Sequence, residues 1–100
     1  MIFQALNESA NRGELILVNG AMCRYHIRKD GVLVIREIIV MPSERRKGLG
    51  RSIVRSLKLQ SNLIIAKCPF AYESNAFWEK VGFSLKSTDG GINTWQLCQG

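Results

Sequence analysis

The first forty positions alternate between short apolar runs and pairs of turn-forming residues. Residues 2–12 place apolar side chains at helical spacing, and Gly13 ends this predicted helix. Three runs with the apolar or alternating pattern of strands follow it: 15–18, 21–29 and 32–41. An Asn-Gly pair at 19–20 and an Asp-Gly pair at 30–31 are strong signals for tight hairpin turns. The pattern therefore predicts an antiparallel three-strand meander that Pro42 ends.

Apolar residues change from strand spacing to helical spacing beyond position 48. Between 49 and 59 they fall on one face, with polar and basic residues on the other, which predicts an amphipathic helix. The continuous apolar run 63–66 is typical of a strand buried on both faces. Because a helix separates it from the strand 32–41, we expect the two strands to pair in parallel through a crossover connection.

The last third of the chain predicts one short helix and two strands. Ser74 has the side chain of a helix N-cap, 76–81 can form two turns, and Gly82 suits the C-terminal end. Strands are expected at 83–86 and 93–98, on either side of a glycine-containing turn. The expected fold is α/β (α+β), with a mixed sheet built from the meander and then helix, strand, helix and two strands.

The composition is that of one small domain over residues 1–100. Apolar residues make up 46% and charged residues 22%, which suffices for a single core. No apolar run approaches the ~20 residues of a membrane span, and no basic head with an apolar stretch opens the chain. We therefore expect a cytoplasmic protein without a membrane partner. The net charge of +6 favours an anionic partner, but the location of the charge decides more than its sum.

The cysteines do not form a recognisable site. Cys23, Cys68 and Cys98 are odd in number and lack the spacing of metal ligands, so no metal is predicted. Free thiols in a reducing compartment are the expected state. The single histidine, His26, lies three residues from Cys23, and in a strand the two side chains would point to opposite faces. This spacing disfavours a cysteine–histidine catalytic pair.

A basic, glycine-containing segment joins the third predicted strand to the long helix. Three cations, Arg45, Arg46 and Lys47, precede Gly48 and Gly50. The first turn of a helix has N–H groups without intrahelical partners, and the helix dipole adds partial positive charge there. Glycines let an anion approach these donors, so the segment predicts a pyrophosphate-binding cradle. A solvated basic loop is the other interpretation of the same residues.

Two motifs in the chain resemble the GNAT superfamily of acetyl-CoA-dependent N-acetyltransferases. A Walker-type phosphate loop and a dinucleotide fingerprint are both absent. Instead, residues 45–50 match the family's Arg/Gln-x-x-Gly-x-Gly/Ala signature, and Val-x-Pro at 40–42 matches the strand end before it. Phe-Trp-Glu-Lys-Val-Gly-Phe at 77–83 is similar to the family's Phe/Leu-Tyr-Glu-Lys-x-Gly-Phe. The resemblance covers residues 14–98.

The resemblance implies a GNAT-like fold with acetyl-CoA as co-substrate. In the family, the strands that match 32–41 and 63–67 splay apart, and the pantetheine arm lies between them. The N–H groups of 46–51 would hold the pyrophosphate, and the Met41 N–H would stabilise the developing oxyanion. Carried over to this sequence, the residues implied in cofactor binding are Ile39, Val40, Met41, Arg45, Arg46, Lys47, Gly48, Leu49, Gly50, Arg51, Asn75 and Trp78.

The resemblance also implies direct attack of a neutral amine on the thioester, which needs a base and an acid. Glu37, on the strand beside the site, could be the base, with His26 as a second candidate; a surface glutamate is an equally good interpretation of Glu37. Where the family has a tyrosine as acid, this chain has Trp78, whose indole N–H does not ionise near neutral pH. Tyr72, Cys68 or water could donate instead, or the thiolate could leave unassisted.

The sequence departs from the family in two further ways. No room exists before Leu15 for the family's first strand or for part of the helical wall of the acceptor site, so a homodimer could complete the site. Ala71 stands where the family's helper asparagine is found. Asn75, one turn before Trp78, could contact the cofactor or could cap the helix start.

Three functions remain, in descending order of support. The first is an N-acetyltransferase that acts on an amine of a small molecule or a peptide. The second is a non-catalytic acyl-CoA-binding module, which Trp78 and the short N-terminus favour. The third, a basic nucleic-acid-binding domain, would spread basic and aromatic side chains over one face. Here three cations are contiguous at a helix entrance, so nucleic acid is not the expected partner.

Overall fold

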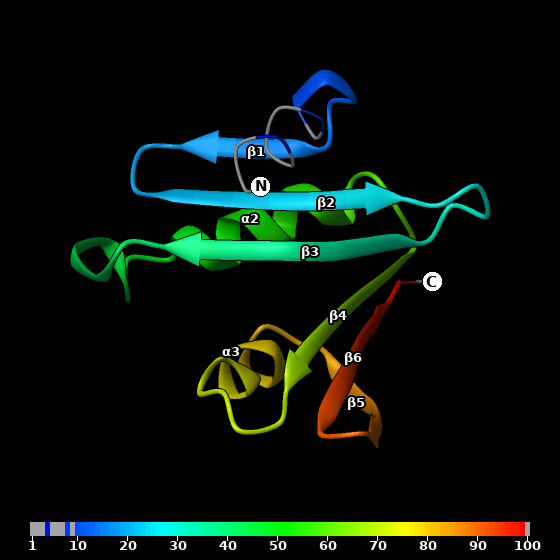
Figure 1. Cartoon of the computed structure of the whole chain (residues 1–100). Coiled ribbons are helices and arrows are strands. Elements are labelled where there is room, and N and C mark those ends of the chain that lie inside the picture. Colours follow the sequence, from blue (N-terminus) through cyan, green and yellow to red (C-terminus); the bar gives the residue numbers. More distant parts are fainter. Residues whose placement is uncertain (1–3, 5–7, 9, 100) are drawn as a thin grey trace.

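The computed structural model of the chain describes residues 4, 8 and 10–99. Within them, six strands form one mixed sheet in the order β1-β2-β3-β4-β6-β5, and two helices pack against it (Figure 1). The elements in chain order are β1 (Leu15–Val18), β2 (Ala21–Ile27), β3 (Leu33–Val40), the 3-10 turn η1 (Pro42–Glu44), α2 (Leu49–Lys58), β4 (Leu63–Pro69), α3 (Ser74–Lys80), β5 (Ser84–Asp89) and β6 (Ile92–Cys98). The predicted fold class is confirmed.

The first three strands form the predicted antiparallel meander. Gly20 and Gly31 take the left-handed φ values of 92° and 89° that the two predicted hairpin turns need. β2 ends at Ile27 and not at position 29, because Arg28 already belongs to the turn and donates its N–H to the Val32 carbonyl. β3 is one residue shorter at each end than the predicted 32–41.

The hydrophobic core lies on one face of the sheet. Tyr25, Ile35, Ala66 and Trp95 are register partners across four neighbouring strands, and all four are buried. Side chains alternate between the two faces of a strand, so this row marks the buried face. The apolar stripe of α2 covers it with Ile53, Val54 and Leu57, which are buried together with the strand residues.

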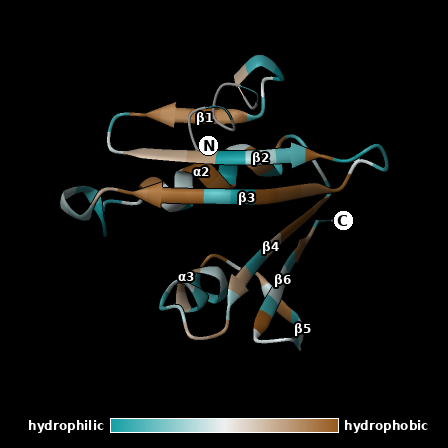
Figure 2. Cartoon of the chain, viewed as in Figure 1, coloured by the Kyte–Doolittle hydropathy of each residue, from teal (hydrophilic) through white to brown (hydrophobic). Residues whose placement is uncertain are grey.

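A bulge interrupts the pairing of β2 with β3. Arg24 pairs with Glu37 and Tyr25 pairs with Ile35, which leaves Arg36 as the extra residue. Figure 2 shows the corresponding hydrophilic segment in the middle of an otherwise hydrophobic β3. The bulge places two consecutive charged residues, Arg36 and Glu37, where the rest of the strand is apolar.

The C-terminal elements occur where they were predicted, with shifted ends. The prediction that Ser74 caps α3 was wrong: the N-cap is Glu73, without a side-chain cap bond, and Ser74 is the first helical residue. Its hydroxyl lies 3.1 Å from the Cys68 sulfur instead. Phe83 is buried and precedes β5, which runs on to Asp89 and not only to position 86.

The helix predicted at 2–12 falls mostly on residues 1–3, 5–7 and 9, which lie outside the described residues. The described residues Gln4, Glu8, Ala10 and Asn11 are helical. The segment ends at Gly13, where φ is 70°, as the sequence predicted.

Candidate functional site

Strands β3 and β4 pair in parallel over three residue pairs only and then separate. Pairing starts at Leu33 with Ile64 and ends at Ile35 with Ala66, although β3 continues to Val40 and β4 to Pro69. Figure 1 shows the two strands diverging like the arms of a V. The predicted parallel crossover and the splayed strands are both confirmed. The edge of β3 beyond Ile35 therefore has no strand partner on the β4 side.

The direction of the main-chain groups on this edge follows from one hydrogen bond. The Met41 N–H donates to the Gly20 carbonyl at 2.8 Å, on the β2 side. In an antiparallel ladder, alternate residues turn their N–H and C=O groups toward the same neighbour. Ile39 therefore also faces β2, whereas Ile38 and Val40 face the opening. The Val40 carbonyl accepts a bond from Arg45 Nε at 3.3 Å, which agrees with this direction.

The proposed oxyanion donor at Met41 thus has to be corrected. Its N–H is already paired, so it is not available to a ligand. The Val40 N–H, one residue earlier, points into the opening. The sequence places both residues at the strand end, but the direction of each amide depends on the register with β2, which no local pattern specifies.

The loop that follows β3 exposes a series of unpaired N–H groups. Among the described residues, no N–H of 46–51 donates to a backbone carbonyl or a side chain; the first such bond of α2 runs from the Ser52 N–H to the Gly48 carbonyl at 2.9 Å. Arg46 and Gly48 both have positive φ, 67° and 82°. Left-handed residues alternating with right-handed ones curl successive N–H groups into a concave anion-binding nest. The free amides, the two left-handed residues and the helix start are the features that the predicted cradle requires.

The two glycines of the motif have different structural roles. A Cβ on Gly48 would meet no atom within 4 Å, so this position needs glycine for its conformation and for open access. A Cβ on Gly50 would lie 2.8 Å from Phe77 Cε1. Gly50 is buried, and this position needs glycine because α3 packs against it, not because an anion must pass. The prediction that Gly50 opens the way for an anion was therefore wrong.

The cations of the loop are exposed and point to solvent-accessible space. Arg45, Arg46, Lys47 and Arg51 are all exposed, and Lys47 lies 3.2 Å from the Glu44 carboxylate. Leu49 is half-buried against the core. These side chains add attraction for a negatively charged group near the free amides.

Glu37 lies where β3 leaves β4, beside the opening. Its side chain is 29% exposed, and its Oε1 atom is buried without a hydrogen-bond partner among the described residues. The nearest cation, Arg24 Nε, is 3.8 Å away, beyond hydrogen-bonding distance, and is itself buried and unpartnered. Because Oε1 is buried, the other oxygen of this partly exposed carboxylate is the atom that a bound molecule could reach.

The other candidates for proton transfer are arranged less favourably. His26 Nδ1 is 3.1 Å from the Glu14 carboxylate and is held by it. Tyr72 is 61% exposed in the loop between β4 and α3. Cys68 is buried, and its sulfur contacts the Ser74 hydroxyl. Burial raises the pKa of the Cys23 thiol to about 12, so that thiol stays protonated.

Asn75 and Trp78 were both expected to bind the cofactor. In the structure the side-chain amide of Asn75 is hydrogen-bonded within the protein, and the Trp78 ring is buried. Asn75 Nδ2 donates to the carbonyls of Pro69, Phe70 and Tyr72, and its Oδ1 accepts from Asn93 Nδ2 at 3.0 Å and Trp95 Nε1 at 2.8 Å. Trp78 is 4% exposed, with ring centroids 5.0 Å from Phe77 and 5.1 Å from Phe83. Both side chains are therefore engaged by contacts within the protein.

Replacing Asn75 by alanine should lower the free energy of unfolding by about 2–3 kcal/mol. The change leaves the Asn93 amide and the Trp95 indole N–H without their acceptor inside the protein, and each buried unsatisfied group costs about 1–3 kcal/mol. Urea denaturation measures the effect. Asn62→Ala, at an exposed position, is the matched control and should change stability by less than about 0.5 kcal/mol. A similar effect of both variants would contradict the structural role of Asn75.

Glu14, which sequence reasoning did not single out, anchors the start of β1 to β2. It is 7% exposed and accepts bonds from the Ile27 N–H at 2.8 Å and Arg12 Nε at 2.9 Å, with His26 Nδ1 beside it. Burial raises the pKa of Glu14, but these hydrogen bonds and charges outweigh burial and hold the pKa below its ordinary value of 4.5.

The Glu14 carboxylate should make the stability of the fold sensitive to acid. Because its pKa is lower in the folded chain, its contribution is fully present above pH 4.5 and is lost as the pH falls through the folded-state value. Glu14→Gln should therefore be about 2 kcal/mol less stable at neutral pH, and the gap to the original chain should narrow in acid. Urea denaturation of both proteins at neutral and at acidic pH measures this difference in stability. A gap that stays constant would show that Glu14 is not the titrating group.

Solved acetyltransferase structures share this fold. A GNAT-family acetyltransferase from Listeria monocytogenes aligns with 89% of this chain at a TM-score of 0.67 and 12% identity. A proposed streptothricin acetyltransferase from Bacillus anthracis, solved with acetyl coenzyme A, aligns with 95% of this chain at a TM-score of 0.79 and 18% identity. The PaiA N-acetyltransferase from Thermoplasma acidophilum, solved with coenzyme A, aligns with 97% of this chain at a TM-score of 0.78 and 12% identity. The chain spans 66% of the first structure and 69% of each of the other two.

These likenesses establish the GNAT fold for this chain. The sequence matches no family model and no curated protein sequence. No helix within residues 4, 8 and 10–99 has the length and apolar character needed to cross a membrane. In the same part of the chain, no three His, Cys, Asp or Glu residues are grouped so that they could hold a metal ion.

Proposed function

We propose that this chain is an N-acetyltransferase that binds acetyl-CoA in the opening between β3 and β4 and transfers its acetyl group to an amine. One observation carries the proposal: the unpaired edge of β3 leads directly into the unpaired N–H groups of residues 46–51. A long ligand with a diphosphate at one end of an extended arm matches this arrangement of donors. The GNAT fold, seen elsewhere with coenzyme A or acetyl-CoA bound, supports the same assignment.

The residues present fit such a ligand. The amides of 46–51 would hold the diphosphate, and the exposed Arg45, Arg46, Lys47 and Arg51 would add attraction. The main-chain groups of Ile38 and Val40, which face the opening, would hold the arm. Ile39 and Met41 would contribute side chains only. The main chain of Ile39 and the Met41 N–H face β2, and the Met41 carbonyl accepts from the Glu44 N–H.

The chemistry that acetyl-CoA supplies is a thioester carbonyl that a neutral amine can attack directly. The Val40 N–H is placed to donate to the carbonyl oxygen as negative charge develops on it, and a fixed donor of this kind is often the largest catalytic contribution. Glu37, a partly exposed carboxylate beside the opening, would accept the proton of the attacking amine. Tyr72 or a water molecule would protonate the leaving sulfur.

Two measurements test the proposal. Calorimetry should show binding of acetyl-CoA, with adenosine as a control that lacks the diphosphate and the arm. Release of free thiol from acetyl-CoA in the presence of a panel of amines should then show turnover. A chain that takes up no acetyl-CoA would overturn the proposal.

A specific observation keeps the non-catalytic acyl-CoA-binding module as a second candidate. Trp78, at the place of the family's acidic tyrosine, is buried, and its Nε1 has no partner among the described residues. It cannot protonate a leaving group. Tight binding of acetyl-CoA without thiol release on any amine would favour the module over the enzyme.

Beyond acetyl transfer to an amine, we expect a homodimer and a cytoplasmic location. A second copy of the chain would contribute a wall of the acceptor site, as the resemblance to the family implies. A cytoplasmic location would suit the three free cysteines. Sedimentation of the chain with acetyl-CoA, over a range of protein concentrations, tests the homodimer.

A further inference from the structure

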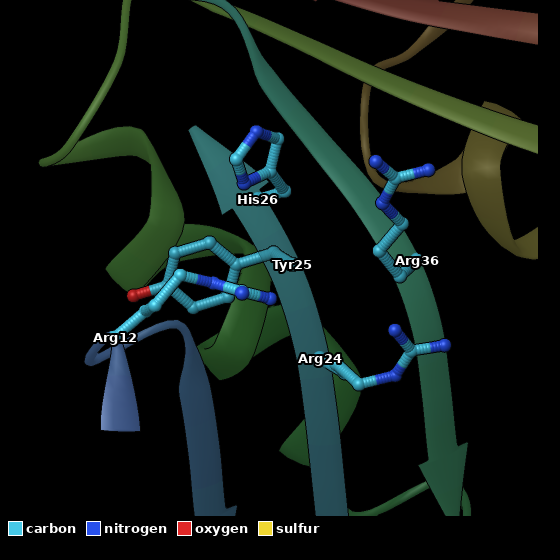
Figure 3. Close-up of a pocket in the computed structure, with 5 residues that line it drawn as sticks. All are labelled: Arg12, Arg24, Tyr25, His26 and Arg36. Atoms are coloured by element: carbon cyan, nitrogen blue, oxygen red, sulfur yellow. The ribbon is translucent and has the colours of Figure 1, made fainter. Parts of the chain in front are cut away.

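A cation-lined hollow lies next to the candidate base. It has a volume of about 340 Å³, and its lining residues are Arg12, Arg24, Tyr25, His26 and Arg36. Arg24 and His26 alternate along β2 with the buried Cys23 and Tyr25, so their side chains lie on the sheet face opposite the core. Figure 3 shows the Arg24 side chain reaching from β2 across to β3, and the Arg36 side chain leaving β3 in another direction.

The cations of the hollow are not balanced by the acids around it. Arg12 Nε is 2.9 Å from Glu14, but Arg24 Nε and Glu37 Oε1 are 3.8 Å apart and both lack a hydrogen-bond partner. Arg36 makes no ion pair with any residue in the described part of the chain. Three guanidinium groups therefore face two carboxylates, and the hollow has excess positive charge.

Guanidinium groups recognise carboxylate and phosphate oxygens with paired, charge-assisted hydrogen bonds. Arg24 Nε is buried without a partner, so an anion in the hollow would accept from the terminal Nη groups of this side chain, which is 24% exposed. The exposed Arg36 has its donors free for the same anion. The hollow thus has the chemistry of an anion site and not of a site for a cation or an apolar group.

The position of Glu37 relates this hollow to the proposed reaction. Glu37 lies at the fork between β3 and β4 and only 3.8 Å from the Arg24 guanidinium. An amine that loses its proton to Glu37 would therefore have the hollow immediately beside it. An anionic group a few bonds from that amine would reach Arg24 and Arg36.

We propose that the acceptor is a small amine that carries a carboxylate, phosphate or phosphonate close to the amino group, and that Arg24 and Arg36 bind this anion. The inference rests on the proposed acetyltransferase function and narrows its acceptor. Polyamines are disfavoured, because like charges would face each other in the hollow. Peptide N-termini are disfavoured as well, because their nearest carboxyl group is tied up in an amide bond.

The test measures binding of acetylated products, because amines and their amide analogues differ in basicity and would confuse a comparison of rates. N-Acetylglycine, N-acetylglycinamide and N-acetylaminomethylphosphonate are titrated by calorimetry into the protein with and without coenzyme A. The carboxylate or the phosphonate should bind at least about tenfold more tightly than the neutral amide. The stronger of the two anions identifies the anionic group.

Two variants assign the effect to the hollow. Arg36→Gln should remove most of the preference for the anion, whereas Arg55→Gln, which removes the same charge from an exposed position on α2, should keep it. Equal binding of acid and amide, or an unchanged preference in Arg36→Gln, would overturn the inference. Failure to take up coenzyme A would instead count against the proposed function, since the titration without coenzyme A still measures the anion site.

Discussion

Glu37→Gln should lower kcat for acetyl transfer by about 100-fold or more and leave the KM for acetyl-CoA nearly unchanged. Glutamine keeps the volume of the side chain but cannot accept the proton of the attacking amine, and general-base catalysis contributes about 10²- to 10⁴-fold. The coenzyme would contact the main chain of β3 and the loop, which this change leaves intact. Steady-state thiol release, with acetyl-CoA and the amine varied in turn, measures both constants.

The control for this prediction removes a carboxylate elsewhere. Glu79→Gln lies at an exposed position of α3 and should retain full activity. Because Glu37 faces Arg24, a thermal melt should accompany the kinetics to show that the variant is folded. A folded Glu37→Gln protein with more than half of the original kcat would remove Glu37 from the mechanism and favour the surface-glutamate interpretation.

Gly50→Val should destabilise the chain by about 3 kcal/mol and weaken acetyl-CoA binding at least tenfold. Even a Cβ at this position would lie 2.8 Å from Phe77 Cε1, and valine adds two more carbons. Overpacking of a core costs about 1–3 kcal/mol or more, because side chains or helices must shift. Here the first turn of α2 would move, and with it the amides of the cradle. Urea denaturation and calorimetry give the two values.

A second substitution separates this packing effect from a direct effect on the ligand. Phe77→Ala removes the atoms that the new side chain would meet, so in the double variant Gly50→Val with Phe77→Ala the two changes should cost less than their sum. Gly48→Ala should behave differently, since nothing lies within 4 Å of its Cβ and its cost of about 1–2 kcal/mol comes from the left-handed φ alone. Strict additivity in the double variant would refute the packing explanation.

The meander, the crossover and the free amides before α2 could be predicted from the sequence because each depends on local information. Asn-Gly and Asp-Gly pairs favour the left-handed turns that Gly20 and Gly31 adopt. The helical spacing of Ile53, Val54 and Leu57 determines which face of α2 is buried. Free amides exist at every helix start, so a glycine after a strand and before a helix is enough to predict where an anion could bind.

Other features of the site depend on neighbours that are distant in sequence. Whether Val40 or Met41 presents its amide to the opening depends on the register with β2. The Asn75 side-chain oxygen has its hydrogen bonds filled by Asn93 and Trp95, which lie eighteen and twenty residues later in the sequence. These bonds form because β6 returns beside the loop that holds Asn75. Gly50 is small because of Phe77 on another helix. No window of the chain contains these pairs.

The cation-lined hollow is the clearest example of a feature that depends on residues distant in sequence. Arg24 is an unremarkable charge in the sequence, and only the pairing of β2 with β3 brings it beside Arg36 and Glu37. The sequence alone determines which segments become strands and helices and where a diphosphate could lie, because turn preference and periodicity act between near neighbours. The tertiary structure decides which amides, carboxylates and guanidinium groups face the same space, because strand register and helix packing set directions that local residues do not encode.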